Sequence, residues 1–275
     1  MPEGPEIRRA TDAIAKVLRG KTVLNLEFGQ LHLAAWSKRL INAVVLEVEP
    51  RGKAVLTHFA NEKTIYSHNQ LYGEWAIFKI GAEPATHKQR RIVLDTDEHR
   101  IVLYSASDIE VLDSAQVSKH PYIAKLGVEL LDPSVSLMDV VACLNEPRWQ
   151  KKLLAQILLD QAFLAGVGNY LRSEILYVAK LHPWVRLADL STAQRKIFAR
   201  AAITVVRQAY RSAGITNKLT SAKALKAAGV PFSVYRHFVF DRDGQSCWAC
   251  QATIVREEVA GRQLHWCPSC QPKAA

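Results

Sequence analysis

Four of the five cysteines lie close together near the end of the printed sequence. They form two pairs, Cys247-Trp-Ala-Cys250 and Cys267-Pro-Ser-Cys270, separated by sixteen residues. Each pair places two thiolates on one side of a tight turn, and two pairs complete the tetrahedron that a structural zinc ion requires. We therefore predict one structural Zn²⁺ bound by these four cysteines, in a zinc finger that spans residues 235–275.

One interpretation of the cysteines competes with zinc binding. A redox-active C-x-x-C pair is the main alternative, but the sequence lacks the strand–helix–strand context of a thioredoxin-like protein. Four thiolates leave no open coordination position, so the zinc is expected to be structural and no catalytic cofactor is predicted. Cys143 lies in a predicted helix and is expected to be a small buried apolar residue.

The positive charge of the chain is large and unevenly distributed. The formal net charge is +10 at pH 7, and residues 190–240 contain nine Lys or Arg residues but no Asp or Glu. A basic folded surface indicates a polyanionic partner, with nucleic acid first, although solubility alone is an alternative. No apolar run approaches the roughly 18–20 residues that span a bilayer, and the acidic, proline-containing N-terminus does not resemble a signal peptide. We expect a cytoplasmic protein without a membrane partner.

The first half of the chain is predicted to be a β-sandwich preceded by one helix. Residues 5–20 have apolar residues on one helical face, with Pro5 in the first turn and Gly20 at the C-terminal cap. Short β-rich segments separated by turns then indicate a sandwich or barrel. The predicted strands are Val23–Phe28, Val44–Val48, Ala54–Phe59, Thr64–Ser67, Glu74–Ile80, Arg91–Asp95, Arg100–Tyr104 and Asp108–Leu112.

The second half is predicted to be helical up to the cysteines. Helical spacing predicts helices over residues 136–144, 151–163, 169–180 and 192–212. Together these patterns predict an α+β protein in three parts. They are an N-terminal β-sandwich domain over residues 1–130, a helical domain over residues 131–234 and the zinc finger over residues 235–275.

Pro2 offers unusual chemistry if Met1 is removed. An α-amino group has a pKa of roughly 8, against about 10.4 for lysine, so more of it is neutral and nucleophilic at pH 7. When the secondary amine of proline adds to an aldehyde carbon, the product is an iminium with no N–H proton to lose. Its positive charge therefore persists as an electron sink for elimination.

Glu3 and Glu6 follow Pro2 at the start of the first predicted helix. Acidic residues favour helix N-termini through the helix dipole, and this structural role is sufficient to explain them. The functional interpretation is that one carboxyl group transfers protons at a reacting centre beside Pro2.

These features together resemble the formamidopyrimidine-DNA glycosylase/endonuclease VIII family, in particular its bacterial endonuclease VIII branch. The resemblance rests on Met1-Pro2-Glu3-Gly4-Pro5-Glu6, on the Gly166–Tyr170 turn and on the zinc hairpin with Arg262 after Gly261. It covers essentially the whole chain. It implies a β-sandwich domain, a helix-two-turn-helix domain and a zinc finger, with damaged double-stranded DNA as the partner of a monomeric, nucleoid-associated bacterial enzyme.

The resemblance also implies roles for single residues. Pro2 matches the nucleophile, Glu3 the acid/base and Arg262 the finger arginine at the flipped nucleotide's phosphate. Lys53 matches a strand lysine that contacts a phosphate and takes part in proton transfer. Asn169 matches the turn asparagine that holds the DNA backbone, although it is also suited to cap the following helix.

A loop and a missing motif distinguish the branches of the family. His68-Asn69-Gln70-Leu71-Tyr72-Gly73 resembles the endonuclease VIII loop in which Gln70, Leu71 and Tyr72 fill the gap left by a flipped nucleotide. Residues 104–110 lack the Asp-Pro-Arg-Arg-Phe-Gly motif of formamidopyrimidine glycosylases, which favours oxidised pyrimidines as substrates. Lys125 is the DNA-contacting basic position before Gly127, where endonuclease VIII can have arginine, so a point charge replaces a bidentate contact.

The predicted function is a bifunctional DNA glycosylase/AP lyase of base excision repair. It removes oxidised pyrimidines through an N-terminal proline Schiff base and cuts the strand by β,δ-elimination. One alternative is an oxidised-purine glycosylase of the same family. The other is a non-catalytic, zinc-stabilised DNA-binding protein, which would give no reason for a Pro-Glu terminus anchored on a helix.

Overall fold

The computed structural model describes residues 2–273, and the chain divides into two compact units. Unit 1 contains Pro2 and Glu6–Lys125. Unit 2 contains Leu126 onward and, from the other end of the chain, Glu3–Pro5. The beginning of the chain therefore contributes to both units, and this division places Glu3 beside elements that are distant in the sequence.

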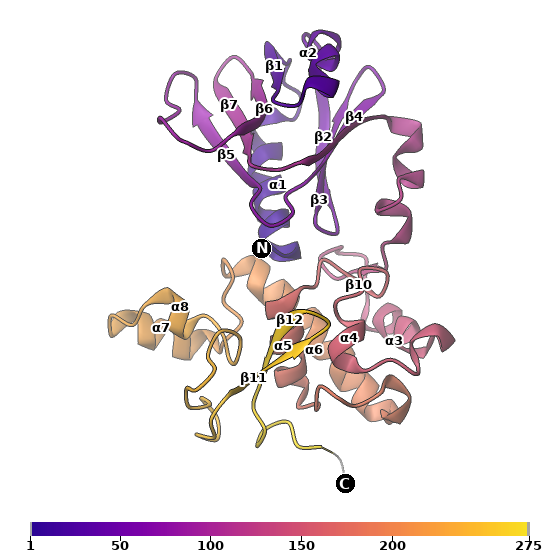
Figure 1. Cartoon of the computed structure of the whole chain (residues 1–275), viewed down its shortest axis with the longest axis vertical. Helices are drawn as coiled ribbons and strands as arrows, with labels where there is room; N and C mark the ends of the chain where they lie inside the picture. The colour runs from indigo at the N-terminus through magenta and orange to yellow at the C-terminus, as the bar shows by residue number, and fades with distance from the viewer. Residues whose placement is uncertain (1, 274–275) are drawn as a thin grey trace. The chain divides into compact units, whose positions relative to one another are not determined.

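Unit 1 is built on two four-stranded sheets (Figure 1). One sheet has the order β1-β6-β7-β5 and the other the order β2-β3-β4-β8, and every pairing within them is antiparallel. All eight predicted strands are confirmed, with ends that move by at most three residues. They are β1 (Asn25–Phe28), β2 (Val45–Arg51), β3 (Ala54–Phe59), β4 (Lys63–His68), β5 (Glu74–Lys79), β6 (Arg90–Asp95), β7 (His99–Tyr104) and β8 (Asp108–Asp113).

Helix α1 (Gly4–Leu18) contributes one apolar face to the core of unit 1. Ile7, Ile14 and Leu18 are each 1% exposed and pack with inward-facing strand residues. The side chains of strands alternate between two faces, so each sheet supplies one apolar face to this core. A short 3-10 turn and helix α2 (Ala34–Leu40), which the sequence pattern did not predict, follow β1. Further 3-10 turns over Ser114–Lys119 and Ile123–Lys125 end the unit.

Unit 2 has a helical core to which a β-hairpin is added (Figure 1). Helix α5 packs against α6 and against the hairpin, whose Val259, Leu264 and Trp266 join the same apolar cluster. The two capping boxes, Ser136 with Asp139 and Ser191 with Gln194, fix where α3 and α6 begin. The elements are β9 (Val128–Glu129), α3 (Leu137–Asn145), α4 (Leu154–Ile157), β10 (Leu164–Ala165), α5 (Asn169–Ala179), α6 (Thr192–Arg211), α7 (Leu219–Ala227), α8 (Phe232–Tyr235), β11 (Val255–Val259) and β12 (Arg262–Trp266).

The helix predicted over residues 151–163 is wrong except for the single turn α4. Leu153 is extended and forms an isolated bridge with Arg186, and the Leu154 amide donates to the carbonyl of Val185. After that turn, the side chain of Asp160 accepts from the amide of Ala162 and ends the helical path. Contacts with a distant segment therefore override a locally helical spacing.

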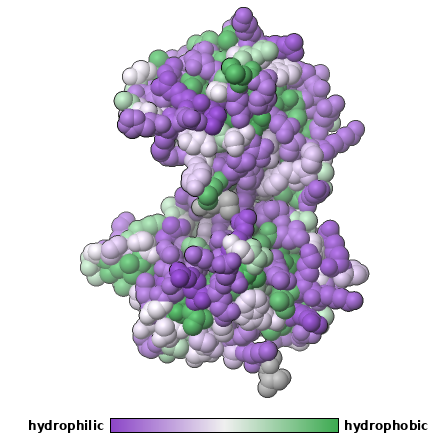
Figure 2. All heavy atoms as spheres, viewed as in Figure 1, coloured by the Kyte–Doolittle hydropathy of each residue, from purple (hydrophilic) through white to green (hydrophobic). Residues whose placement is uncertain are grey.

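Cys143 is 5% exposed within α3, which confirms its expected burial. Hydrophobic side chains gather on the surface over α7 and α8 (Figure 2), where Leu219 and Phe232 are 49% and 42% exposed. Among residues 2–273, no helix is long and apolar enough to cross a membrane.

Candidate active site

The Glu3 carboxylate is bound by the backbone at the start of helix α5. Its Oε2 accepts hydrogen bonds from the amides of Gly168 at 2.7 Å and Leu171 at 3.3 Å, and its Oε1 accepts one from Tyr170 at 2.9 Å. The side chain is 3% exposed. The first amides of a helix have no intrahelical partner and carry the positive end of the dipole, so they stabilise a carboxylate here. Glu3, the residue before α1, therefore caps a different helix, whose N-cap residue Gly168 lies 165 residues further along the chain.

Glycines make this close approach sterically accessible. A Cβ on Gly168 would lie 2.5 Å from both Cδ and Oε1 of Glu3, a distance that side chains do not tolerate. The amide of Gly4 donates to the carbonyl of Gly166 at 2.8 Å, and Gly166 has a φ of +85°. The Gly166–Tyr170 turn thus binds both the backbone and the side chain of the N-terminal segment.

Pro2 is held in place by its peptide bond to Glu3. Because Glu3 and the Gly4 amide are both bonded to the turn before α5, Pro2 has little freedom to move away from the Glu3 carboxylate. Pro2 itself is half-buried. Met1, whose removal the proposed chemistry requires, lies outside the described residues.

Asn169 is the first residue of α5, but it does not cap the helix. Gly168 is the N-cap residue and makes no side-chain capping bond, while Glu3 supplies the acceptor oxygens. The Oδ1 of Asn169 is buried and has no hydrogen-bond partner among the described residues. The capping role expected as an alternative is therefore wrong, and the binding role stays a prediction.

A buried arginine joins α5 to the tip of the zinc hairpin. Arg172 is fully buried, and its guanidinium donates to the carbonyls of Gln263 at 2.8 Å, Arg262 at 3.3 Å and Ala155 at 2.9 Å. Burial lowers the pKa of Arg172 to about 10, against the opposing effect of the Glu3 charge. These bonds fix the backbone of Arg262, which leaves its exposed side chain at a defined place on the surface.

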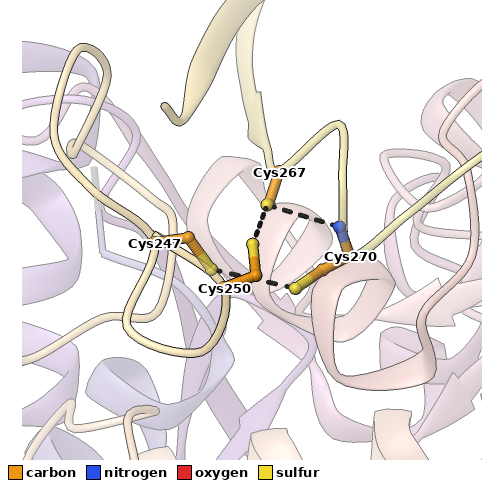
Figure 3. A group of neighbouring side chains, drawn as sticks. All are labelled: Cys247, Cys250, Cys267 and Cys270. Atoms are coloured by element: carbon orange, nitrogen blue, oxygen red, sulfur yellow. Dashed lines mark hydrogen bonds between the residues drawn. The ribbon is translucent and has the colours of Figure 1, made fainter. Parts of the chain in front are cut away.

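The four cysteines converge as the spacing predicted (Figure 3). Their Sγ atoms all lie within 4.8 Å of one another, with 3.8 Å between Cys247 and Cys270 and 3.5 Å between Cys250 and Cys267. A tetrahedral zinc with Zn–S bonds of about 2.3 Å requires sulfur atoms roughly 3.8 Å apart. The donor set and spacing fit a structural zinc ion.

Helix α5 also supports this cysteine cluster. The hydroxyl of Tyr177 lies 3.4 Å from the Sγ of Cys247. Burial would raise the pKa of this thiol, but hydrogen bonds from Tyr177 and from backbone amides lower it to about 6. One turn earlier, the buried Glu174 accepts from the consecutive amides of Phe238, Val239 and Phe240. The finger and the segment leading into it are thus anchored on the helix that holds Glu3.

Lys53 lies in unit 1 at the turn before β3 and is 7% exposed. Its amide donates to the hydroxyl of Tyr122 at 2.8 Å, and the ring of Tyr122 meets that of His68 edge-on at 5.3 Å. Burial lowers the pKa of His68, and the Lys53 charge acts in the same direction while Asp108 opposes it. Lys53 and His68, the first residue of the predicted gap-filling loop, therefore both contact Tyr122.

The loop over residues 69–73 is a closed turn with an exposed tip. The Gly73 amide donates to the carbonyl of Asn69 at 2.7 Å, and the Asn69 side chain donates to the Gly73 carbonyl at 3.1 Å. A Cβ on Gly73 would lie 2.4 Å from the Asn69 carbonyl oxygen, so only glycine fits. Leu71 and Tyr72 are 55% and 77% exposed. The tip is preformed, and its apolar side chains face solvent.

Two further predicted site residues occupy less informative positions. Lys125 is exposed and ends the last 3-10 turn of unit 1. Glu6 is half-buried in the first turn of α1, where an acidic residue matches the helix dipole.

Three supporting residues were not among the predicted site residues: Arg172, His68 and Ser107. A charged residue among the mostly apolar residues of the predicted helix over 169–180 was the available signal for Arg172. His68 belongs to the quoted loop motif, but its bond to the Gln70 amide requires the folded turn. The Ser107 contact with Gln70 joins segments 37 residues apart and left no signal in the sequence.

Family models match most of the chain. The N-terminal domain of formamidopyrimidine-DNA glycosylase matches residues 1–107, and the H2TH domain of the same family matches residues 126–221. Endonuclease 8 of Escherichia coli is 42% identical over 271 residues, which cover 98% of this chain and 100% of the relative. Endonuclease 8 of Shigella sonnei is 41% identical with the same coverage.

Solved structures share the fold at lower sequence identity. The Lactococcus lactis Fpg (MutM) bound to DNA containing FAPY-dG has a TM-score of 0.80 at 20% identity, covering 98% of this chain and 99% of that chain. The same protein with abasic-site DNA gives 0.81 at 22% identity, covering 98% and 100%. The full-length match to Endonuclease 8, together with both domain matches, shows that the chain belongs to the formamidopyrimidine-DNA glycosylase family.

Proposed function

We propose that the chain is a bifunctional DNA glycosylase and AP lyase that removes oxidised pyrimidines. The observation that carries this proposal is the Glu3 carboxylate, held by three amides of α5 directly beside Pro2 in the sequence. A carboxyl group fixed next to a terminal secondary amine combines a nucleophile with a proton-transfer group. A purely DNA-binding protein has no need for this arrangement.

The proposed reaction begins at the Pro2 nitrogen once Met1 has been removed. Its lone pair forms a bond to the anomeric carbon of the damaged nucleotide, and the bond from that carbon to the base breaks as the base accepts a proton. Opening of the sugar ring leaves an iminium. Loss of a proton from the neighbouring carbon expels the phosphate on one side, and a second elimination expels the other. Glu3 is the proposed proton carrier.

The other predicted residues are assigned to DNA binding. Arg262 and Lys53 contact phosphates near the flipped nucleotide, and Lys53 also assists proton transfer. Asn169 and Lys125 hold the backbone, while Gln70, Leu71 and Tyr72 replace the nucleotide that leaves the duplex. Damaged double-stranded DNA is the proposed partner, and the enzyme is proposed to act as a monomer. Because its substrate is chromosomal DNA, we expect it at the bacterial nucleoid.

One structural Zn²⁺ bound by Cys247, Cys250, Cys267 and Cys270 is the only metal that this proposal includes. When bound, it braces the finger and supplies no catalytic chemistry, because four thiolates complete its coordination. The chain's own contribution is the bonding of Arg172 to the hairpin tip, which orients Arg262.

The substrate class follows from the branch of the family. Endonuclease 8 proteins match the full length at 41–42% identity, whereas the Fpg structures match at 20–22%. Residues 104–110 read Tyr-Ser-Ala-Ser-Asp-Ile-Glu and lack the duplex-plugging motif of the purine enzymes. We expect faster excision of thymine glycol than of oxidised guanine from matched duplexes. Preferred excision of oxidised guanine opposite cytosine would support the alternative purine activity.

Borohydride trapping on abasic DNA tests the proposed chemistry, because reduction converts an iminium into a stable covalent bond. The wild-type protein is expected to trap. Pro2→Gly is expected to trap far less, because the imine of a primary amine can lose its N–H proton and then lacks the positive charge that favours reduction. Pro231→Gly, a substitution in the loop before α8, is a matched control for the loss of a proline ring and is expected to trap like wild type. Equal trapping by Pro2→Gly, or none by wild type, would contradict the proposal.

A further inference from the structure

The side-chain amide of Gln70 is held by a residue outside its loop. The hydroxyl of Ser107 lies 2.6 Å from the Oε1 of Gln70 and donates to it. Gln70 is also fixed by its backbone, since it has a φ of +52° and its amide donates to the Nδ1 of His68 at 3.0 Å. Both side chains are exposed, so this contact lies at the surface where the loop tip meets solvent.

Ser107 is a rigid donor because its own backbone and the two residues before it are anchored. Its carbonyl accepts from the side chain of Gln30 at 2.7 Å. Ala106 is fully buried in the core of unit 1, and the Ser105 amide donates to the carbonyl of Gln89 at 2.9 Å. An exposed hydroxyl held on a fixed backbone can orient a neighbouring amide, which would otherwise rotate freely.

We propose that Ser107 is a positioning residue that turns the Gln70 carbonyl oxygen inward, so that the loop presents the Gln70 amino group to the base left unpaired opposite the lesion. This inference rests on the proposed function, in which the Gln70–Tyr72 tip enters the duplex. An amide whose oxygen is engaged offers only N–H donors at its free edge. The loop therefore recognises a hydrogen-bond acceptor on the unpaired base.

The ring nitrogen at position 1 of adenine is such an acceptor. An oxidised thymine is normally opposite adenine, so the donor orientation of Gln70 matches the base that remains after the lesion is flipped out. Residues 104–110, which lack the motif of the purine enzymes, thus have a role of their own. They carry the Ser107 hydroxyl that orients Gln70.

The test compares thymine glycol opposite adenine with the same lesion opposite 1-deazaadenine, in which a C–H group replaces the acceptor nitrogen. Because one neutral hydrogen bond is lost, the wild-type kcat/KM is expected to fall about three- to tenfold between the two duplexes. The ratio of kcat/KM opposite adenine to kcat/KM opposite 1-deazaadenine measures this effect. Ser107→Ala is expected to lower this ratio at least twofold, toward one. Ser107→Thr, which keeps the hydroxyl, is expected to retain the wild-type ratio.

Two controls separate orientation from general damage. Gln70→Glu keeps the shape but offers only acceptor oxygens, so its ratio is expected to fall to one or below. Ser233→Ala removes an exposed hydroxyl on α8 and is expected to keep the wild-type ratio. Because both duplexes carry the same lesion, a fold defect changes both rates and leaves the ratio unaltered.

The outcomes also distinguish this inference from the proposed function. A wild-type protein that traps abasic DNA but excises equally opposite both bases would overturn the role of Ser107 alone. An unchanged ratio in Ser107→Ala, or a retained ratio in Gln70→Glu, would do the same. A wild-type protein that fails to trap would overturn both.

Discussion

The two regions that carry the proposed chemistry and the proposed recognition are built in opposite ways. Glu3 is 3% exposed and accepts from three backbone amides, one of them reached because residue 168 is glycine. Gln70 is exposed, and its side chain is held by one hydroxyl. The position of the Glu3 carboxylate therefore depends on the backbone of a helix. The position of the Gln70 amide depends on the side chain of one other residue, Ser107.

This difference indicates which substitutions each region tolerates. A carboxylate surrounded by amides has a fixed position, and preorganised groups lose little energy when charge develops beside them. A loop tip with exposed Leu71 and Tyr72 can change its contacts without disturbing a core. We expect substitutions near Glu3 to reduce catalysis on every substrate and substitutions near Gln70 to change the choice among substrates.

Glu3→Gln is the largest expected effect. The amide preserves the shape but removes the proton-transfer group, so single-turnover base excision is expected to fall by about 10²- to 10⁴-fold. The amino group of the substituted side chain would also face the backbone amides that donate to Glu3, which lowers the free energy of unfolding. Thermal unfolding measured alongside excision separates the two losses. An excision rate within threefold of wild type would contradict the assignment of Glu3.

Gly168→Ala tests the steric basis of the Glu3 site. The added Cβ would lie 2.5 Å from the Glu3 carboxyl, so the carboxylate must shift. A displacement of about 1 Å at a catalytic group costs roughly 10²-fold in rate. Gly29→Ala is the matched control, because its Cβ would meet the Arg90 carbonyl at 2.2 Å within unit 1. Both variants should lose stability, but only Gly168→Ala should lose excision per folded molecule.

Arg262→Ala is expected to weaken DNA binding and leave the chemistry after binding less affected. Loss of one charge-assisted contact to phosphate raises KM roughly ten- to hundredfold. The slope of log affinity against log salt should decrease by about 0.9. Gln263→Ala, the neighbouring exposed hairpin residue, should keep the wild-type slope because its carbonyl bond to Arg172 remains. Zinc removal by a chelator should reproduce the Arg262→Ala defect, with additional loss of stability.

A smaller effect is expected from the titration of His68. Burial lowers its pKa below 6.5, so above that pH the imidazole is neutral in both the folded and unfolded states. Below it, the unfolded chain binds a proton that the folded protein resists, so the unfolding free energy falls as the pH falls. Protonation at Nδ1 would also break the bond to the Gln70 amide. His68→Asn should lower the slope of unfolding free energy against pH by at most the amount that corresponds to one bound proton. An unchanged slope would contradict this role of His68.

The sandwich was predictable because short β-rich segments separated by turns are a local signal. The eight predicted strands are present because each is a run of β-branched or other apolar residues, some alternating with polar residues and some continuous, with turns between them. The helix predicted over residues 151–163 failed where Leu153 bonds with Arg186, more than thirty residues away. Helices α7 and α8 are short and partly exposed, so they lack the apolar face that identifies a helix from sequence.

The site was predictable in its residue types and less so in its geometry. The cysteine spacing by itself indicated the metal site, and Pro2 stood out through the chemistry of a terminal secondary amine. The placement of Glu3 on α5 could not be derived from local patterns, because those patterns assign Glu3 to the dipole of α1. The contacts of Arg172 and Ser107 likewise join segments that are 90 and 37 residues apart in the chain.

Mapping the trapped bond by peptide mass analysis tests the central claim most directly. After borohydride reduction on abasic DNA, the protein is digested and the peptide that carries the sugar remnant is identified. The account predicts the remnant on the N-terminal nitrogen of Pro2, in chains that lack Met1. A remnant on Lys53 or another lysine, or trapping by chains that retain Met1, would contradict it.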